Sequence, residues 1–180
     1  METFAEYILA EKDFGRKIEI MVYLKRKTKI FFDNSVIFKA LIVKLFIESM
    51  NIDVDQNKLV TAMLLCECKK INNAQDIEKI KAYAKEGADF LSKLGFSEDF
   101  CLICEQHNRY NNNVARKKEA DILELADQFG GMLLDRPERV AFPIEEALIL
   151  LENRNLKNYN NAYLNEFKDF INVTKEVNFS

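Results

Sequence analysis

The sequence is poor in glycine and proline, with five of the first and two of the second among 180 residues. These residues mark the turns between short strands, and no run of valine, isoleucine or threonine alternates with polar residues over the length of a strand. A β architecture is therefore not expected. Every apolar run is interrupted well before the roughly 18 residues that a membrane-spanning helix needs. A glycine-rich phosphate-binding loop is also missing.

The chain lacks an excess of positive charge, because 26 lysines and arginines face 29 aspartates and glutamates for a net charge of −3. Nucleic-acid binding needs a concentration of basic side chains against the phosphates, so we expect no nucleic-acid partner. The first residues, from Met1 to Glu6, carry acids where a secretory signal would be basic and then apolar. We therefore expect a cytoplasmic protein with no membrane partner.

The four cysteines form two close pairs, Cys66-x-Cys68 and Cys101-x-x-Cys104. In a reducing compartment they are expected to be thiols or metal ligands rather than disulfides. Helical spacing puts Cys101, Cys104 and His107 along one helix face, whereas a zinc knuckle needs a turn between its cysteines. We therefore interpret both pairs as small buried apolar residues.

Apolar residues recur at spacings of three and four along the chain, which predicts an all-α bundle of about seven or more helices. Asp33, Asp55 and Ser97 carry side-chain oxygens suited to helix N-caps, and Gly95 suits a left-handed C-terminal stop. Two short helices are expected in 4–29, divided near Gly15, and others in 33–50, 55–66, 76–94, 97–107, 120–134, 143–151 and 163–170, with loops at 111–113 and 153–161. We predict an N-terminal helical extension, residues 1–30, packed on a single domain, residues 31–175.

Three stretches, in order along the chain, resemble the HD-GYP branch of the HD-domain phosphohydrolases. The longest is similar to the family's VADxFDAL, DRPYR and EEAL segments and reads Ile122-Leu-Glu-Leu-Ala-Asp127-Gln-Phe, Asp135-Arg136-Pro137-Glu-Arg139 and Glu145-Glu-Ala-Leu. The others resemble its AALLHDIGKI and HHERxDGxGYP motifs and read Thr61-Ala-Met-Leu-Leu-Cys66-Glu67-Cys68-Lys69-Lys70-Ile71 and Ile103-Cys-Glu-Gln106-His107-Asn108-Arg109-Tyr110-Asn111. The resemblance covers residues 33–170 and implies an HD-domain-like helical bundle with a core that includes Leu64, Leu65, Leu125, Phe129 and Leu148.

The resemblance also implies a phosphodiesterase site in which histidines and aspartates hold two or three metal ions. Its positions fall on eight residues of this chain: Asn34, Cys66, Glu67, Lys70, Tyr83, Gln106, His107 and Asp127. Only Lys70, His107 and Asp127 keep the family's residue type. The glycine-tyrosine-proline element is replaced by residues 112–114, Asn-Asn-Val. Because the sequence contains a single histidine, the family's metal cluster cannot be rebuilt.

The charged residues that remain leave more than one interpretation open. Asp127 is either a metal ligand or a structural acid paired with Arg136 or Arg139. His107 is either a ligand or a hydrogen-bonded core or capping residue. Glu67 keeps the charge of the aspartate it replaces but is one methylene longer, so it is either a ligand after some adjustment or a polar core residue.

A zinc ion would need a four-residue set of Cys66, Glu67, His107 and Asp127. A nucleophile pair of Cys66 and His107 has no oxyanion hole or third orienting group to support it. Without a metal, the carboxylates would repel each other unless one is protonated or paired with a cation such as Lys70. We therefore expect a pocket that is collapsed or bridged by hydrogen bonds, with no metal ion and no other cofactor.

Loss of most site positions favours a noncatalytic HD-GYP-like domain that acts as a regulatory or protein-interaction module in signalling. Its partner would be another protein or a second copy of the chain. One alternative is a metal-dependent phosphohydrolase with a reduced site, in which a divalent ion is held by Glu67, His107, Asp127 and either Cys66 or Asn34. The other alternative is a pseudoenzyme that binds a nucleotide without cleaving it.

Overall fold

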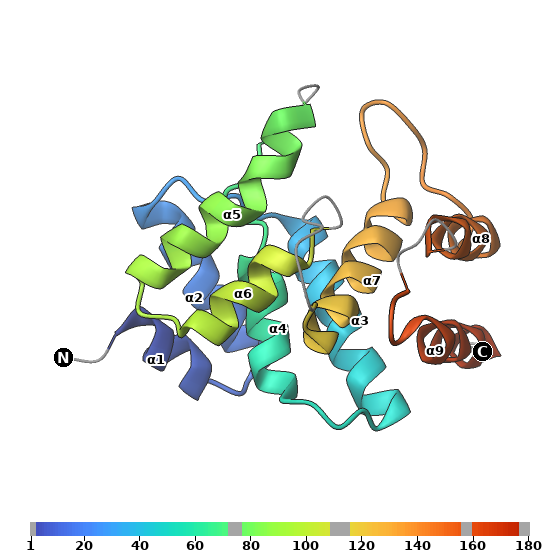
Figure 1. The fold of residues 1–180 in the computed structure, drawn as a ribbon, viewed down its shortest axis with the longest axis horizontal. Helices are drawn as coiled ribbons and strands as arrows, with labels where there is room; N and C mark the ends of the chain where they lie inside the picture. Colours follow the sequence, from blue (N-terminus) through green and yellow to red (C-terminus); the bar gives the residue numbers. More distant parts are fainter. Residues whose placement is uncertain (1–2, 72–76, 109–115, 156–159, 177–180) are drawn as a thin grey trace.

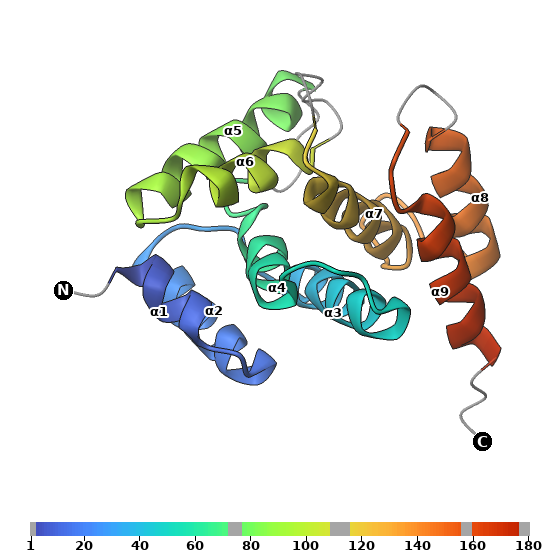
Figure 2. The ribbon, with the colours of Figure 1, turned by 60° about the horizontal axis from the view of Figure 1, so that its bottom comes forward.

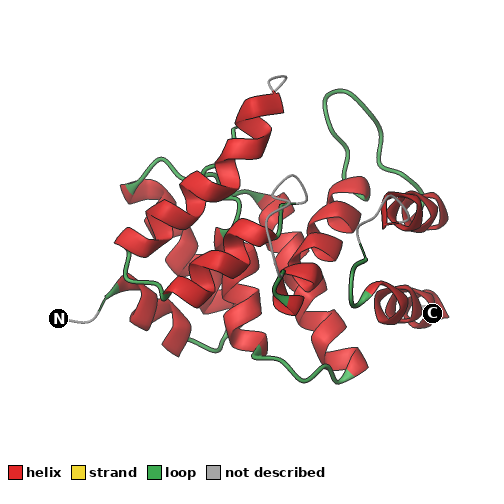
Figure 3. Cartoon of the chain, viewed as in Figure 1, coloured by secondary structure: helices red, strands yellow, loops and turns green. Residues whose placement is uncertain are grey.

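The computed structural model describes residues 3–71, 77–108, 116–155 and 160–176. Over these residues it contains helices and no strand, which confirms the predicted all-α bundle (Figures 1 and 3). The helices in the described part of the chain are α1 Phe4–Ala10, α2 Phe14–Lys27, α3 Asn34–Met50, α4 Gln56–Leu65, α5 Ile77–Lys93, α6 Glu98–Gln106, α7 Lys118–Met132, α8 Ile144–Asn155 and α9 Leu164–Glu176.

Several helices begin where a side-chain oxygen accepts a hydrogen bond from a free backbone N–H of the first turn. This confirms the predicted caps at Asp33, Asp55 and Ser97, which begin α3, α4 and α6. Thr3 begins α1 with a reciprocal capping box to Glu6, and Asp13 begins α2. The break between α1 and α2 therefore lies before Gly15, which belongs to the first turn of α2.

Gly95 ends the α5 region as predicted, with a left-handed φ of 93°. Its N–H donates to the Ser92 carbonyl, and the next N–H, that of Phe96, donates to the Leu91 carbonyl. A side chain at this position would also approach Thr3 to within 2.8 Å. Both the conformation and the close contact with the start of α1 therefore require glycine.

Other expected boundaries differ by a residue or two from those in the structure. The helix expected to start at Pro143 begins at Ile144, and the Pro143 carbonyl accepts the N–H of Ala147. The helix expected in 120–134 spans 118–132, because Lys117 takes the N-cap position. The loop expected in 153–161 starts later, since α8 continues to Asn155. The expected helix start at residue 76, the break at 111–113 and residues 156–159 lie outside the described residues.

Helix α3 is central and packs against α4, α7 and α9, while the α5–α6 pair packs on α4 through α6 (Figures 1 and 2). Helix α8 packs on α7, and α1 packs on α4 at the opposite end of the molecule. Rings of Phe46, Phe129 and Phe167 join α3, α7 and α9 with centroids 5.1–5.4 Å apart. These contacts hold the middle of α7 against α3, where the candidate site lies.

Four of the five predicted core residues are fully buried, namely Leu64, Leu65, Leu125 and Phe129. The fifth, Leu148, is only partly buried at the edge of the core. Its prediction is wrong because Ala147 and Leu151 occupy the inward face of α8. Among the described residues, none of the helices has the length and apolar character needed to cross a membrane.

The predicted N-terminal extension contains α1 and α2, which join the rest of the fold through a buried lysine. Lys17 of α2 is 1% exposed and donates to the Ile8 carbonyl of α1 and to the Thr61 hydroxyl of α4, at 2.6 and 2.7 Å. Burial lowers the pKa of Lys17 to about 8, although Glu11 and Asp55 oppose this shift. The ammonium satisfies a carbonyl in the last turn of α1.

Candidate functional site

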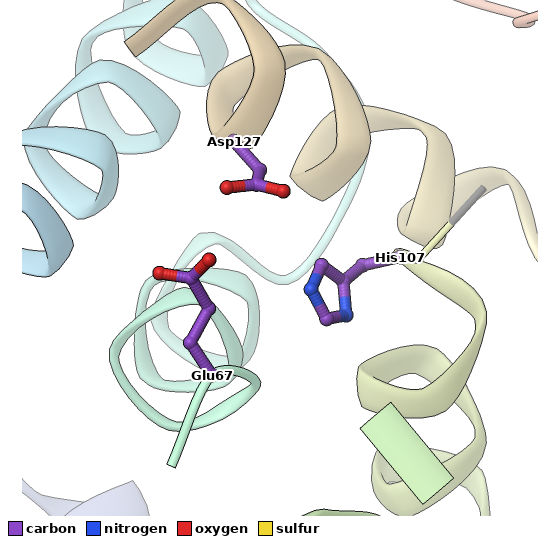
Figure 4. Close-up of side chains that lie close together, drawn as sticks. All are labelled: Glu67, His107 and Asp127. Carbon is purple, nitrogen blue, oxygen red and sulfur yellow. The ribbon is translucent and has the colours of Figure 1, made fainter. Parts of the chain in front are cut away.

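Three of the predicted site residues meet at one place, although they are far apart in the sequence. Glu67 lies in the turn that follows α4, His107 is the C-cap of α6, and Asp127 lies on α7. One nitrogen or oxygen atom of each lies within 4.8 Å of the corresponding atoms of the other two (Figure 4). The ends of α4 and α6 and the middle of α7 thus bring a buried imidazole and two carboxylates together.

A lysine from α3 lies between the two carboxylates. Lys39 is 1% exposed, and its Nζ donates to Oδ1 of Asp127 at 2.6 Å. The same Nζ lies 3.2 and 3.1 Å from Oε1 and Oε2 of Glu67. Lys70 adds a second cation, because its Nζ also forms an ion pair with Oε1 of Glu67. Two ammonium groups therefore balance the two carboxylates.

These contacts stabilise the charged forms of Lys39 and Asp127. Burial alone would lower the pKa of Lys39, but the carboxylates of Asp127 and Glu67 outweigh it and raise this pKa. Burial alone would raise the pKa of Asp127, but Lys39, Lys70 and His107 outweigh it and lower this pKa below its usual range. Lys39 and Asp127 therefore form a pair of opposite charges at neutral pH.

The position of His107 is fixed by hydrogen bonds at both ring nitrogens. Its Nδ1 lies 2.5 Å from the Cys104 carbonyl oxygen, which can only accept, so Nδ1 carries the proton. Its Nε2 lies 3.2 Å from the Tyr83 hydroxyl, which donates to it. The phenol of Tyr83 thus lies at a position where the family resemblance implies a histidine. His107 is both the C-cap of α6 and a hydrogen-bonded core residue, in agreement with one of the two predicted roles.

Burial also determines the charge of His107. It lowers the pKa of this imidazole, and the nearby carboxylates of Asp127 and Glu67 oppose the shift only in part. The unfolded chain therefore binds more protons than the folded chain at pH values between the lowered pKa and about 6.5. Stability falls as the pH decreases through this window, and the folded imidazole is neutral at pH 7.

We expect the single imidazole of the chain to titrate with a midpoint below 6.5, because burial disfavours its protonated form and the nearby carboxylates offset this only in part. The measurement is the proton NMR shift of the His107 ring against pH, made on a chain without a histidine tag. The same chain in urea is the control and should titrate near pH 6.5. A folded-state midpoint above that of the unfolded control would contradict the neutral assignment.

Three other predicted positions lie near the cluster without joining it. Asn34 is exposed in the first turn of α3. Gln106 is buried and accepts the N–H of Lys117 at 2.7 Å, so it fixes the segment before α7. The sulfur of Cys66 contacts the Met63 carbonyl in the preceding turn and is not among the atoms that cluster within 4.8 Å. The four-residue zinc site that would include Cys66 is therefore reduced to three residues.

The cysteines are free and buried. Burial raises the pKa of Cys68 to about 12, and it raises the pKa of Cys66 and Cys104 well above the usual value. Burial raises the pKa of Cys101 as well. All four are therefore thiols at neutral pH, and a nucleophilic Cys66 thiolate has no basis in the structure. This agrees with their interpretation as small buried residues.

The predicted pairing of Asp127 with Arg136 or Arg139 is wrong, because the acid's partner is Lys39. Arg139 instead donates to the carbonyls of Gly131, Met132 and Leu134, the last turn of α7 and the residues after it. These carbonyls lack partners within the helix, and a cation at a helix C-terminus also complements the helix dipole. The DRPER segment therefore closes the end of α7 rather than the site.

Comparisons with known proteins identify no related protein. A scan of protein-family models, a search of curated proteins and a search of solved structures each find no match. The HD-GYP resemblance therefore rests on the three sequence stretches described above.

The site residue that the sequence interpretation missed is Lys39. A signal for it was present, because Lys39 is three residues after Val36 and four before Val43, on the apolar side of its helix. A lysine at such a position is buried only with a partner, and the nearest candidates were the acids assigned to the site. The sequence predicts Lys70 as the cation, and in the structure this partly exposed residue is the second cation of the cluster.

The family's metal ions do not fit the residues present. Glu67, His107 and Asp127 could offer one ligand atom each, but the Lys39 ammonium is hydrogen-bonded to both carboxylates. A metal at the same place would meet a positive charge and would have to displace these bonds. The ammonium has no open coordination position for a water, so this arrangement cannot lower the pKa of a water as a metal does.

Proposed function

We propose that this chain is a noncatalytic domain of the HD-GYP type that acts as a regulatory or protein-interaction module in signalling. The observation that carries the proposal is the Lys39 ammonium between Glu67 and Asp127, which takes the role of a bound cation. A lysine holds the surrounding helices together through its charge. It supplies neither the activated water nor the Lewis acid that phosphodiester hydrolysis requires.

Two features of the structure support a role through protein contact, namely the well-defined packing of the helices and an exposed aliphatic face on α3. The caps, the core and the ion cluster together specify one packed arrangement of helices, as an interaction module requires. Leu41 and Leu45, one turn apart on α3, are 37% and 41% exposed. Aliphatic residues exposed on one helix face are the kind of surface that a protein partner or a second copy of the chain covers.

We expect no metal-dependent turnover of a cyclic dinucleotide or of bis(4-nitrophenyl) phosphate, because no residue of the cluster activates a water. The assay compares the wild-type chain with Asp127→Ala in the presence of Mn²⁺. Trace hydrolysis that is equal in both proteins indicates a contaminant and agrees with the proposal. Turnover that Asp127→Ala abolishes would show that the site is catalytic, and it would favour the reduced phosphohydrolase.

A further inference from the structure

The buried lysine of α2 joins three helices through uncharged oxygens. Helices α1 and α2 lie at one end of the molecule, where α1 packs on α4 (Figure 2). The acceptors of the Lys17 Nζ are the Ile8 carbonyl of α1 and the Thr61 hydroxyl of α4. Among the described residues, no carboxylate forms an ion pair with this nitrogen. Lys39, which is equally buried, lies between two carboxylates instead. A buried ammonium is costly without such a counter-charge, so Lys17 has reason to lose its proton.

The hydrogen bonds around Lys17 match an uncharged amine. An ammonium has three hydrogens to donate and an amine has two, and the structure provides two acceptors. The Thr61 hydroxyl donates its own hydrogen to the Asn57 carbonyl at 2.7 Å, so it accepts from Lys17. The Asn57 side-chain amide donates in turn to the Leu9 carbonyl at 2.5 Å. This network binds two carbonyls at the end of α1 to α2 and α4, and its one titratable group is Lys17.

Two acids on the neighbouring helices act on Lys17 without contacting it. Glu11 at the C-cap of α1 and Asp55 at the N-cap of α4 favour the ammonium form. Their carboxylates accept other hydrogen bonds, from the N–H groups of Asp13 and Lys58 respectively. Burial outweighs both acids and lowers the pKa of Lys17 to about 8. The amine is therefore the main form in the folded chain above pH 8.

We propose that Lys17 is a pH-sensitive latch, which holds α1 and α2 against α4 more firmly as an amine than as an ammonium. In an open state, with α1 and α2 detached from α4, the Lys17 Nζ would lie in water. Ala5 and Ile8, the buried side chains of α1, would leave the core and uncover the face of α4 beneath them. The pH would thus set how often this face of α4 is exposed.

The direction of the effect follows from the protons that each state binds. A lysine in water keeps its proton up to about pH 10.4. The open state therefore binds more protons than the closed state between about pH 8 and 10.4, and closure becomes more favourable as the pH rises through this window. Below pH 8 both states carry the ammonium, and the closed state retains the cost of burying it.

The test measures how often α1 opens at pH 7 and at pH 9, from the hydrogen-exchange protection factors of its backbone amides. A protection factor compares exchange with that of an unstructured peptide at the same pH, so the direct effect of base on exchange cancels. Lys17→Met in the full chain fills the space of the lysine stem without a charge. Lys17→Gln keeps two N–H donors and stays neutral at both pH values. Lys12→Met is the matched control, because it removes an exposed lysine between α1 and α2.

Between pH 7 and pH 9, the opening of α1 should decrease about tenfold more in the wild-type chain and in Lys12→Met than in either Lys17 variant. Comparison with the variants cancels the effect of other groups that titrate in this range, such as the α-amino group. An equal change in all four proteins would overturn the proposal. A wild-type change as large in the amides of α4 as in those of α1 would also overturn it, because the whole fold and not a latch would then respond.

Discussion

Replacing Lys39 by methionine is expected to lower the free energy of unfolding by about 3–5 kcal/mol at neutral pH. Methionine has a similar length and fills the space of the lysine stem, so little packing is lost. The loss comes from Glu67 and Asp127, which would then face each other as two carboxylates with only Lys70 near them. The measurement is urea unfolding of both proteins, followed by circular dichroism.

The pH dependence of this difference has a definite sign. In the wild-type chain the lowered pKa of Asp127 contributes stability above about pH 3.8, and this stability is lost as the pH falls through the folded-state pKa. In the variant Asp127 takes up a proton more readily, because the Lys39 ammonium no longer stabilises its charged form. The gap between the two proteins should therefore shrink as the pH is lowered from 7 toward 4.

Two further variants separate the charge effect from a general effect of the substitution. Lys44→Met on the same helix removes a surface pair with Glu48 and should cost less than about 1 kcal/mol. The double variant Lys39→Met with Asp127→Asn removes a charge of each sign and should recover much of the loss. A Lys39→Met variant as stable as the Lys44→Met control would show that the ion cluster does not support the fold.

Replacing Lys39 by alanine is expected to create a metal site where the wild-type chain has an ammonium. Removal of the side chain leaves Glu67, His107 and Asp127 with ligand atoms within 4.8 Å of one another. The Nδ1–H bond to the Cys104 carbonyl already orients the ring as in zinc sites, with Nε2 directed toward Tyr83 and the cluster. Two carboxylates and an imidazole are an adequate ligand set for Zn²⁺.

The readout is the unfolding free energy with and without Zn²⁺. At a hundredfold excess over its dissociation constant, a ligand that binds only the folded state adds about 2.7 kcal/mol. We expect a gain of this order for Lys39→Ala and no gain for the wild-type chain. Lys39→Ala combined with Asp127→Ala is the control and should lose the gain. Equal stabilisation of the wild-type chain by Zn²⁺ would mean that Lys39 does not exclude a metal.

The helical fold was largely predictable because its signals are local. Spacing of apolar residues, the caps at Asp33, Asp55 and Ser97 and the stop at Gly95 each depend on a few adjacent residues. The boundaries at Pro143 and Lys117 were less predictable, since several residues near a helix end compete for the cap position.

The site was harder to predict, because its chemistry depends on residues from four separate elements. Motif comparison brought Glu67, His107 and Asp127 together, since these positions fall within the three resembling stretches. It could not supply Lys39, which replaces no residue of the motifs and comes from a helix that carries only one site position, Asn34. It also assigned the wrong partner to Asp127, because proximity in sequence favoured Arg136 and Arg139 over a lysine 88 residues away.

The metal content of the purified wild-type chain, measured by mass spectrometry, tests most directly whether an ammonium has replaced the metal. A chain with Lys39 bonded to Glu67 and Asp127 is expected to contain far less than one transition-metal ion per molecule, and added chelator should not alter its stability. One zinc, manganese or iron ion per chain, with loss of stability when a chelator removes it, would contradict the account.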